Sequence, residues 1–364
     1  MRTLTTTRAA RAVAVALVAA ATTAARLAAQ ESPAPPAARP VPVVFDTDMG
    51  NDVDDALALA MLHALASRGE ARLVAVTLTK DEPYAAPFVD LVNTFYGRPD
   101  VPIGVARSGV TPHANFQTTV AGRRGPRGGP LYPHDLRDGR RAPAAVDVLR
   151  RALAAEPDSS VVVVQVGFST NLARLLDTPG DRHSPLAGRE LVARKVRLLA
   201  VMAGYFGAPE RAPAPGFVEF NVEKDVASAR TLFARWPTAI EVSGWEVGNA
   251  VVYPAQSIER DYGYATHHPV RDAYLRYRDV RYPYDRPTWD LTSVLQALRP
   301  DRGYFGRSAP GRVTLDARGR TAFRPEPGGP HRYLTVSPEQ AARALEAMVQ
   351  LASQPPRGAP AARQ

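Results

Sequence analysis

Five aspartates lie within ten residues of this chain: Asp46, Asp48, Asp52, Asp54 and Asp55. Carboxylates packed this closely repel one another, and a bound cation relieves the repulsion. The donors are oxygen atoms only, because no His or Cys is nearby, and this donor set suits a hard ion such as Ca²⁺ or Mg²⁺. A solvated turn that caps a helix is the alternative, since Asp is favoured at helix N-termini. The number and spacing of the carboxylates favour the cation site.

The acidic stretch connects a predicted strand to a predicted helix. The apolar run 41–45 predicts a buried strand, Gly50 predicts a turn, and the apolar pattern of 56–66 predicts a helix. In an open α/β sheet, ligands bind beyond the carboxyl ends of strands, which is where these aspartates lie. An EF-hand loop is excluded, because with Asp46 in first position the bidentate glutamate would fall on Leu57.

Strands and helices alternate along the rest of the chain. Apolar, β-branched runs predict further buried strands at 73–79, 101–105, 161–166, 196–203 and 238–242. Helices are predicted at 87–96, 142–155, 171–177, 221–235, 290–298 and 338–351, and a hairpin at 312–323. The alternation predicts an α/β fold, a single doubly wound domain with a mostly parallel central sheet and a small C-terminal β-hairpin. Residues 107–141, rich in Gly, Pro and Arg, predict a lid, a binding loop or disorder.

The N-terminus has the pattern of an export signal. Arginines open the chain, a small apolar run follows at 12–25, and Leu27-Ala28-Ala29 offers a cleavage site. The apolar run is too short to span a membrane. We therefore expect a signal peptide at 1–30, a Pro/Ala-rich linker at 31–40, the α/β domain at 41–353 and a disordered tail at 354–364. The mature protein is expected in the periplasm or outside the cell, with no membrane attachment.

Composition excludes several other functions. The chain has no cysteine, so disulfides, thiolate catalysis and Cys-zinc sites are ruled out. Its formal net charge is +9, but the arginines are scattered among acidic residues and form no stripe. We therefore expect no nucleic-acid partner.

The acidic stretch resembles the N-terminal signature of the inosine-uridine nucleoside hydrolase family, in a variant with two extra residues before the Asp-Asp-Ala. The matching letters are Asp46-Thr47-Asp48-x-Gly50-x-Asp52-x-Asp54-Asp55-Ala56. Later segments that resemble family motifs are Val166-Gly167-Phe168-Ser169-Thr170-Asn171-Leu172, Met202-Ala203-Gly204, Glu219-Phe220-Asn221 and Trp289-Asp290-Leu291. The resemblance covers most of residues 41–353 and implies an N-ribosyl hydrolase that takes a small-molecule ribonucleoside. The oligomeric state, a homo-oligomer included, is left open.

The resemblance also implies a role for each matching residue. The ligands of a Ca²⁺ ion would be Asp48, Asp55, Asp290 and the backbone carbonyl of Val166. Asp48 would also act as the catalytic base that accepts a proton from the attacking water. The substrate-binding residues would be Asp54, Asp81, Met202, Glu219, Asn221 and Trp289, of which Asp81 is the loosest match. Asp46 would orient the loop, and Asp52 belongs to the two-residue expansion with its role open.

Two positions depart from the family pattern. Pro213 stands where the family has an asparagine that contacts the sugar, and Trp289 stands where the family often has a histidine that contacts or protonates the leaving base. A tryptophan can stack on a base but cannot donate a proton at neutral pH. The visible substitutes are His134, His267, His268 and the tyrosines between 262 and 284, for most of which we expect core packing. We expect His63 to be structural and the other three histidines to lie on the surface.

Two alternatives remain open. The run Val43-Val44-Phe45-Asp46-x-Asp48 also resembles the first motif of haloacid-dehalogenase-type phosphatases, with Asp46 as nucleophile. That family needs a later Gly-Asp-x-x-x-Asp motif, whereas Gly180-Asp181 is followed by Pro185. The other alternative is an exported, Ca²⁺-dependent nucleoside- or sugar-binding protein without turnover, which the missing histidine at Trp289 keeps open.

Overall fold

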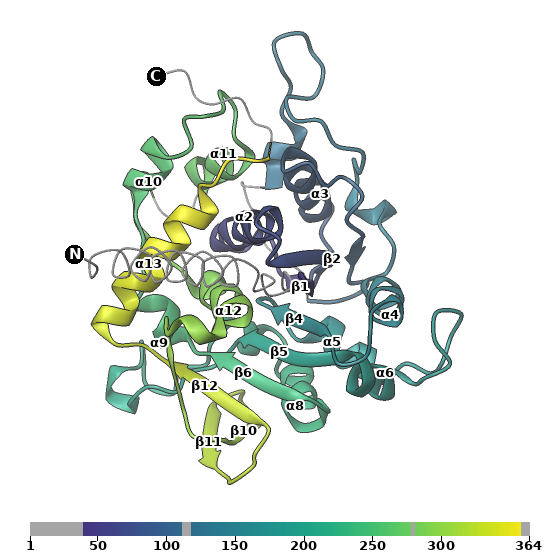
Figure 1. Cartoon of the computed structure of the whole chain (residues 1–364), viewed down its shortest axis with the longest axis vertical. Coiled ribbons are helices and arrows are strands. Elements are labelled where there is room, and N and C mark those ends of the chain that lie inside the picture. The colour runs from purple at the N-terminus through teal and green to yellow at the C-terminus, as the bar shows by residue number, and fades with distance from the viewer. Residues whose placement is uncertain (1–38, 111–117, 278–280, 358–364) are drawn as a thin grey trace, which may run out of the picture. The chain divides into compact units, whose positions relative to one another are not determined.

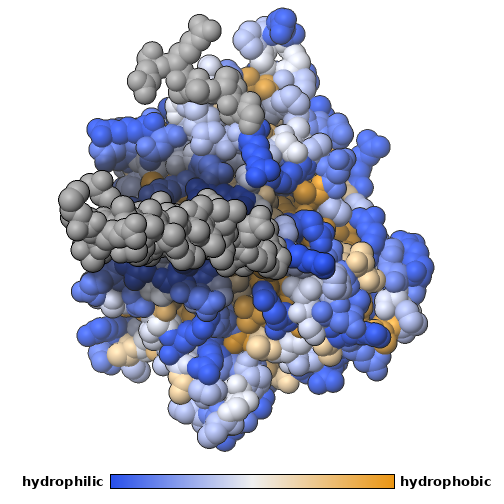
Figure 2. Space-filling view, in the orientation of Figure 1, coloured by the Kyte–Doolittle hydropathy of each residue, from blue (hydrophilic) through white to orange (hydrophobic). Residues whose placement is uncertain are grey.

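The computed structural model describes residues 39–110, 118–277 and 281–357. The predicted signal peptide, the linker up to residue 38 and the tail from residue 358 lie outside the described residues, as does part of the predicted 107–141 loop. The residues from Pro40 onward group into one unit. In the part of the chain that the structure describes, no helix is long and apolar enough to cross a membrane. The face shown in Figure 2 is mostly hydrophilic, with apolar residues gathered in patches.

A ten-stranded sheet forms the centre of the fold, with the strand order β11-β10-β12-β6-β5-β4-β1-β2-β3 and β9 beside β12. The neighbouring strands β3, β2, β1, β4, β5, β6 and β12 pair in parallel. Strands β9, β10 and β11 pair antiparallel to their neighbours. Their bounds are β1 Val41–Thr47, β2 Ala71–Leu78, β3 Ile103–Val105, β4 Val161–Gln165, β5 Val196–Met202, β6 Ala239–Ser243, β9 Gly306–Arg307, β10 Gly311–Leu315, β11 Thr321–Pro325 and β12 His331–Thr335. The predicted doubly wound α/β fold with a C-terminal hairpin (β10–β11) is confirmed.

The order of the parallel strands places a crevice between β1 and β4. The chain runs outward from β1 through β2 to β3, then returns to β4 on the other side of β1 and continues to β5 and β6. The connection after β1 runs to one side of the sheet and the connection after β4 runs to the other. This reversal creates an opening at the carboxyl ends of the two strands, and ligands bind at such openings. The acidic stretch follows β1 at this opening.

Helices cover both faces of the sheet (Figure 1). Successive residues of β1 point to opposite faces, so Val43 and Phe45 belong to one core and Val44 to the other. Helices α2 (Asp54–Ser67), α3 (Ala85–Phe95), α11 (Pro269–Arg276), α12 (Trp289–Leu298) and α13 (Pro338–Ala352) contribute to the first core. The second core contains residues of α4 (Ala145–Ala155), α5 (Thr170–Leu176), α6 (Gly188–Lys195) and α8 (Val226–Arg235). The remaining elements are α7 (Phe220–Lys224), α9 (Trp245–Asn249), α10 (Ala255–Arg260), β7 (Val252–Tyr253), β8 (Arg286–Pro287) and short 3₁₀ turns.

Helix α2 is buried on nearly every side and carries two of the aspartates in its first turn. Its sequence is rich in Ala and Leu all round, the composition of a helix enclosed by other elements. It packs between the sheet and helices α12 and α13. The carboxylates of its first turn, Asp54 and Asp55, are therefore fixed by a helix that has little freedom to move.

The predicted elements are present, and the differences have local causes. The single helix predicted at 221–235 is two helices, because the Asp225 side chain accepts a hydrogen bond from Ser228 N and starts α8 anew. Strand β12 and helix α6 were not predicted. The sequence of β12 mixes His, Arg and Tyr with one buried leucine, so it lacks the apolar run that marks the central strands.

Candidate active site

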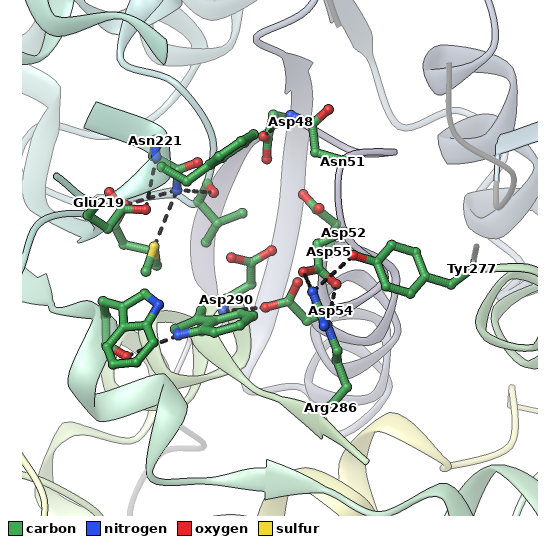
Figure 3. Close-up of a pocket in the computed structure, with 15 residues that line it drawn as sticks. Asp48, Asn51, Asp52, Asp54, Asp55, Glu219, Asn221, Tyr277, Arg286 and Asp290 are labelled. Carbon is green, nitrogen blue, oxygen red and sulfur yellow. Dashed lines mark hydrogen bonds and ion pairs between the residues drawn. The ribbon is translucent and has the colours of Figure 1, made fainter. Parts of the chain in front are cut away.

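A cavity of about 610 Å³ lies at the carboxyl ends of β1, β4 and β5. It gathers residues that are far apart in the sequence, from the acidic stretch to helix α12 (Figure 3). Most of the predicted site residues line it, namely Asp48, Asp52, Asp54, Asp55, Val166, Met202, Glu219, Asn221, Trp289 and Asp290. The structure thus brings together side chains that the sequence separates by more than two hundred positions.

Three carboxylates converge on the floor of the cavity. Asp54 and Asp55 open α2, Asp290 is in the first turn of α12, and one oxygen of each lies within 4.8 Å of the others. The backbone N–H of Asp290 donates to Asp54 Oδ2 at 3.1 Å, and the Thr47 hydroxyl donates to Asp55. All three are buried, and burial together with the neighbouring carboxylates raises their pKa values well above the ordinary value. Buried carboxylates that repel one another are the donor set of a hard cation, so these residues fit an ion such as the Ca²⁺ that the family resemblance implies.

The raised pKa values predict that calcium binding releases protons. Since burial and mutual repulsion raise the pKa values of the three carboxylates, we expect them to keep protons to a higher pH than a free aspartate does when no ion is bound, and a bound cation would displace these protons. Calcium affinity should therefore rise with pH. Calorimetric titrations in buffers of different ionisation enthalpy measure the released protons directly. An affinity that is the same from about pH 5 to about pH 8 would contradict this assignment.

Asp48 lies beside the three carboxylates in a different setting. The Asn51 side chain donates to Asp48 Oδ2, and the Lys80 ammonium donates to Asn51 Oδ1 at 2.9 Å. Burial raises the pKa of Asp48 to about 6, while the positive charge of Lys80 lowers it in part. A carboxyl group with a pKa near neutrality can accept a proton from water and release it again. Asp48 is thus suited to be a base. Asp54, which the resemblance assigned to substrate binding, lies with Asp55 and Asp290 in the carboxylate cluster.

The opposite wall carries the polar side chains of Glu219 and Asn221. Asn221 Nδ2 donates to the backbone carbonyl of Val166 at 2.9 Å and contacts the Met202 sulfur at 3.3 Å. Glu219 begins α7 and accepts from the backbone N–H groups of Gly204 and Asn221. Burial raises the pKa of Glu219 to about 7. These polar groups reach the cavity from the start of α7, and Asn221 bonds residues at the ends of β4 and β5.

Arg286 enters the cavity from β8, and the sequence analysis missed it. Its guanidinium donates from Nε to Asp52 Oδ1 at 2.9 Å and from Nη2 to the Tyr277 hydroxyl at 2.9 Å, and it pairs with the other Asp52 oxygen. It also lies over the rings of Tyr277 and Trp289, 4.9 Å and 5.3 Å from their centroids. Asp52, whose role the sequence left open, holds this arginine in place. No local pattern around Arg286 or Tyr277 could have placed them here.

Two predicted residues lie outside the cavity lining. Asp46 is fully buried in β1 and accepts from Thr77 Oγ1 at 2.5 Å and from Asn171 Nδ2 at 2.8 Å. Because it is enclosed in the sheet, Asp46 cannot be the exposed nucleophile that a phosphatase requires. Asp81 accepts from Ser108 N at 3.1 Å and lies 3.6 Å from the Arg107 guanidinium. Its neighbour Lys80 is the residue that reaches the site, as its position at the end of a buried strand could have indicated.

The histidines take no part in the described site. His63 is buried, bonds Asn93 at 2.9 Å and stacks on Tyr96, which is a structural role, as expected. His267 is exposed, as predicted, but His134 and His268 are buried, which contradicts the surface placement. His268 sits among aromatic rings, and its burial lowers its pKa to about 3. Burial of aromatic and imidazole rings together gains apolar contact that a sequence pattern does not reveal.

Gly167 is needed where two loops meet behind the site. A Cβ atom at this position would collide with the Asp48 backbone nitrogen and lie 2.7 Å from Thr79 Oγ1. Gly167→Ala should therefore displace Asp48, destabilise the protein by about 1–3 kcal/mol and reduce turnover. Thermal unfolding and kcat check this, with Gly129→Ala as the control because a Cβ there meets nothing within 4 Å. An unchanged kcat in Gly167→Ala would show that Asp48 does not depend on this contact.

Comparison with known proteins establishes the family. A sequence profile of the inosine-uridine preferring nucleoside hydrolases matches residues 43–354, most of the chain. The chain therefore belongs to the inosine-uridine preferring nucleoside hydrolase family, and the protein is an N-ribosyl hydrolase. The resemblance seen in the acidic stretch is thereby confirmed, and the phosphatase alternative is wrong. The chain has no match among curated proteins.

Solved structures of nucleoside hydrolases share the fold. An inosine-uridine preferring enzyme from Bacillus anthracis is 16% identical, with a TM-score of 0.64 over 86% of this chain and 99% of that one. A purine-preferring ribonucleoside hydrolase from Gardnerella vaginalis is 18% identical, with a TM-score of 0.62 over 86% and 99%. A plant nucleoside hydrolase is 19% identical, with a TM-score of 0.57 over 87% and 100%. At such identities the likeness establishes the fold alone.

Proposed function

We propose that this protein is an exported, calcium-dependent enzyme that hydrolyses the N-glycosidic bond of ribonucleosides and releases base and ribose. The observation that carries the proposal is the convergence of Asp54, Asp55 and Asp290 on the floor of a cavity at the β1/β4 opening. A buried, all-oxygen cluster of this kind suits a hard cation, and its position is where doubly wound proteins bind ligands.

The residues that would hold the ion are Asp54, Asp55 and Asp290, with Asp48 and the carbonyl of Val166 at the edge of the same cavity. Calcium, when bound, would supply a positive charge that fixes ribose hydroxyls and lowers the pKa of a water molecule. Glu219 and Asn221 lie on the opposite wall and would hydrogen-bond the sugar. The sugar would thus be held between the acidic floor and an amide–carboxylate wall.

Asp48 would accept the proton of the water that attacks the anomeric carbon. Its burial and its raised pKa suit a base that works near neutral pH, and Asn51 holds its side chain in one orientation. The transition state of glycosidic hydrolysis carries positive charge on the sugar ring, which buried carboxylates stabilise. The floor of the cavity therefore serves the reaction as well as the ion.

Export is the second part of the proposal. The signal pattern of residues 1–30 supports it, and so does the absence of cysteine, which makes the folded chain indifferent to an oxidising compartment. Expression of the full chain in a bacterial host, followed by fractionation, tests it. Recovery of a protein shortened by about thirty residues outside the cytoplasm is the expected result.

Ribose release from a panel of nucleosides tests the activity. Because one enzyme with this fold is named inosine-uridine preferring and another purine-preferring, the panel contains both purine and pyrimidine ribosides. We expect ribose to appear with calcium, to disappear with a chelator and to return when calcium is restored. A protein that binds nucleosides tightly but releases no ribose under any condition would be a binding protein, and the proposal would fail.

A further inference from the structure

The cavity has two chemically different ends. One end presents the carboxylate of Glu219 and the amide of Asn221, which suit sugar hydroxyls, and the guanidinium of Arg286 lies across the cavity from them (Figure 3). The indole of Trp289 lies beside that guanidinium, which is 5.3 Å from the ring centroid. A flat nucleobase is better matched by an aromatic face than by carboxylates. With the sugar at the first end, the departing base lies against the second.

The Arg286 guanidinium is the cation of that second end, and it is held rigidly. Asp52 binds two of its nitrogens, the Tyr277 hydroxyl accepts from one of them, and the rings of Tyr277 and Trp289 lie beneath it. Only 16% of its side chain is exposed. A planar guanidinium carries five N–H donors and keeps its proton under all ordinary conditions, so it can donate hydrogen bonds but cannot act as an acid.

We propose that Arg286 binds the leaving group as it departs and stabilises it as an anion, in place of a proton-donating side chain. This inference deepens the proposed function and rests on it. The substrates it favours are ribosides whose leaving group carries negative charge on departure. Asp52, the residue of the loop expansion, is then the positioning residue that aims the guanidinium.

The step balances without a side-chain acid. The bond between the anomeric carbon and the base nitrogen breaks, and its electron pair stays on the base, which Arg286 receives as a hydrogen-bonded anion. A water oxygen bonds the anomeric carbon, and its proton passes to Asp48. Solvent then protonates the released base, and Asp48 returns its proton to solvent. The products are ribose and the neutral base.

The test compares leaving groups in the calcium-loaded wild type and in Arg286→Met. Removing a fixed donor at a site of developing negative charge should lower kcat/KM for inosine and uridine by about 10²-fold. For the p-nitrophenyl riboside, called the activated riboside below, kcat/KM should fall less than about fivefold in Arg286→Met. Its leaving group, p-nitrophenolate, is a stable anion in water and needs little stabilisation from the protein. Added guanidinium ion should restore part of the activity that Arg286→Met loses on inosine. It should leave the activity of the wild type unchanged.

Arg299→Met is the matched control. Arg299 also makes a bidentate pair with a carboxylate, Glu70, at 2.7 Å and 2.8 Å, is 12% exposed, and lies away from the cavity. Its loss should leave the ratio of the two kcat/KM values unchanged. If Arg286→Met does not fold, Arg286→Lys, which keeps the charge but loses the planar fork, should show the same selective loss to a smaller extent.

Two results would overturn the inference while leaving the proposed function intact. One is an equal loss on inosine and on the activated riboside in Arg286→Met, which would indicate a structural role. The other is a wild-type rate that does not depend on leaving-group acidity, which would show that an acid protonates the base. A wild type that releases no ribose even from the activated riboside would overturn the proposed function and this inference with it.

Discussion

Asp55→Ala should abolish calcium binding and ribose release together. Asp55 is one of three carboxylates that meet at the cavity floor, and the variant leaves the ion with two of them. In the wild type, calcium at a hundred times its Kd should stabilise the fold by about 2.7 kcal/mol, which is seen as a higher melting temperature. In Asp55→Ala, added calcium should leave the melting temperature unchanged. Calorimetry and thermal unfolding after thorough chelation measure both effects.

Asp90→Ala is the control for this experiment. Asp90 is also buried, accepts hydrogen bonds from the backbone of residues 135 and 136, and lies outside the cavity. Its loss should lower stability but leave calcium affinity as it is. Calcium binding of wild-type strength in Asp55→Ala would show that the ion is bound elsewhere, and the metal assignment would fall.

Asp48→Asn should separate proton transfer from binding. The amide keeps an oxygen in the position of Asp48 Oδ2 that Asn51 contacts, but it cannot accept a proton. Turnover should fall by a factor on the order of 10² or more, while calcium and the riboside still bind. Single-turnover rates give the chemical step, and calorimetry gives both affinities, with Asp90→Asn as a control for the loss of a buried carboxylate.

The pH dependence gives a second readout for Asp48. Burial raises the pKa of Asp48 to about 6 in the ion-free protein, and a bound cation would lower it, so the ionised base is lost and kcat should decline as the pH falls through that value or below it. In Asp48→Asn this acid limb should be missing from the remaining activity. A loss of binding as large as the loss of turnover would mean that Asp48 is a ligand and has no separate role as base.

The central fold could be predicted from the sequence because its pattern is strong. The valine run of β4 and the apolar run of β1 are buried on both faces, so the residues before their polar carboxyl ends are all apolar and the strands are recognisable on their own. Strand β12 could not be found in this way. It is half-buried, and its membership in the sheet depends on pairing with β6, a strand almost a hundred residues earlier.

Part of the active site could likewise be predicted from the sequence, and part depends on the tertiary structure. The sequence by itself determined the acidic loop, since five carboxylates at the end of one strand carry a chemical meaning that does not depend on distant residues. The resemblance to short family motifs located Glu219, Asn221 and Asp290, each of which lies at the start of a helix. What these motifs share is local geometry, which neighbouring residues specify.

Only the tertiary structure decided which carboxylates lie together and that the Arg286 guanidinium faces Asp52. Asp54 joins Asp55 and Asp290 because the first turns of α2 and α12 meet, and that meeting depends on packing between helices far apart in the chain. Arg286 faces Asp52 across 234 positions, and no pattern near either residue signals the pair. Contacts of this kind arise from the closure of the whole fold, so local sequence carries no trace of them.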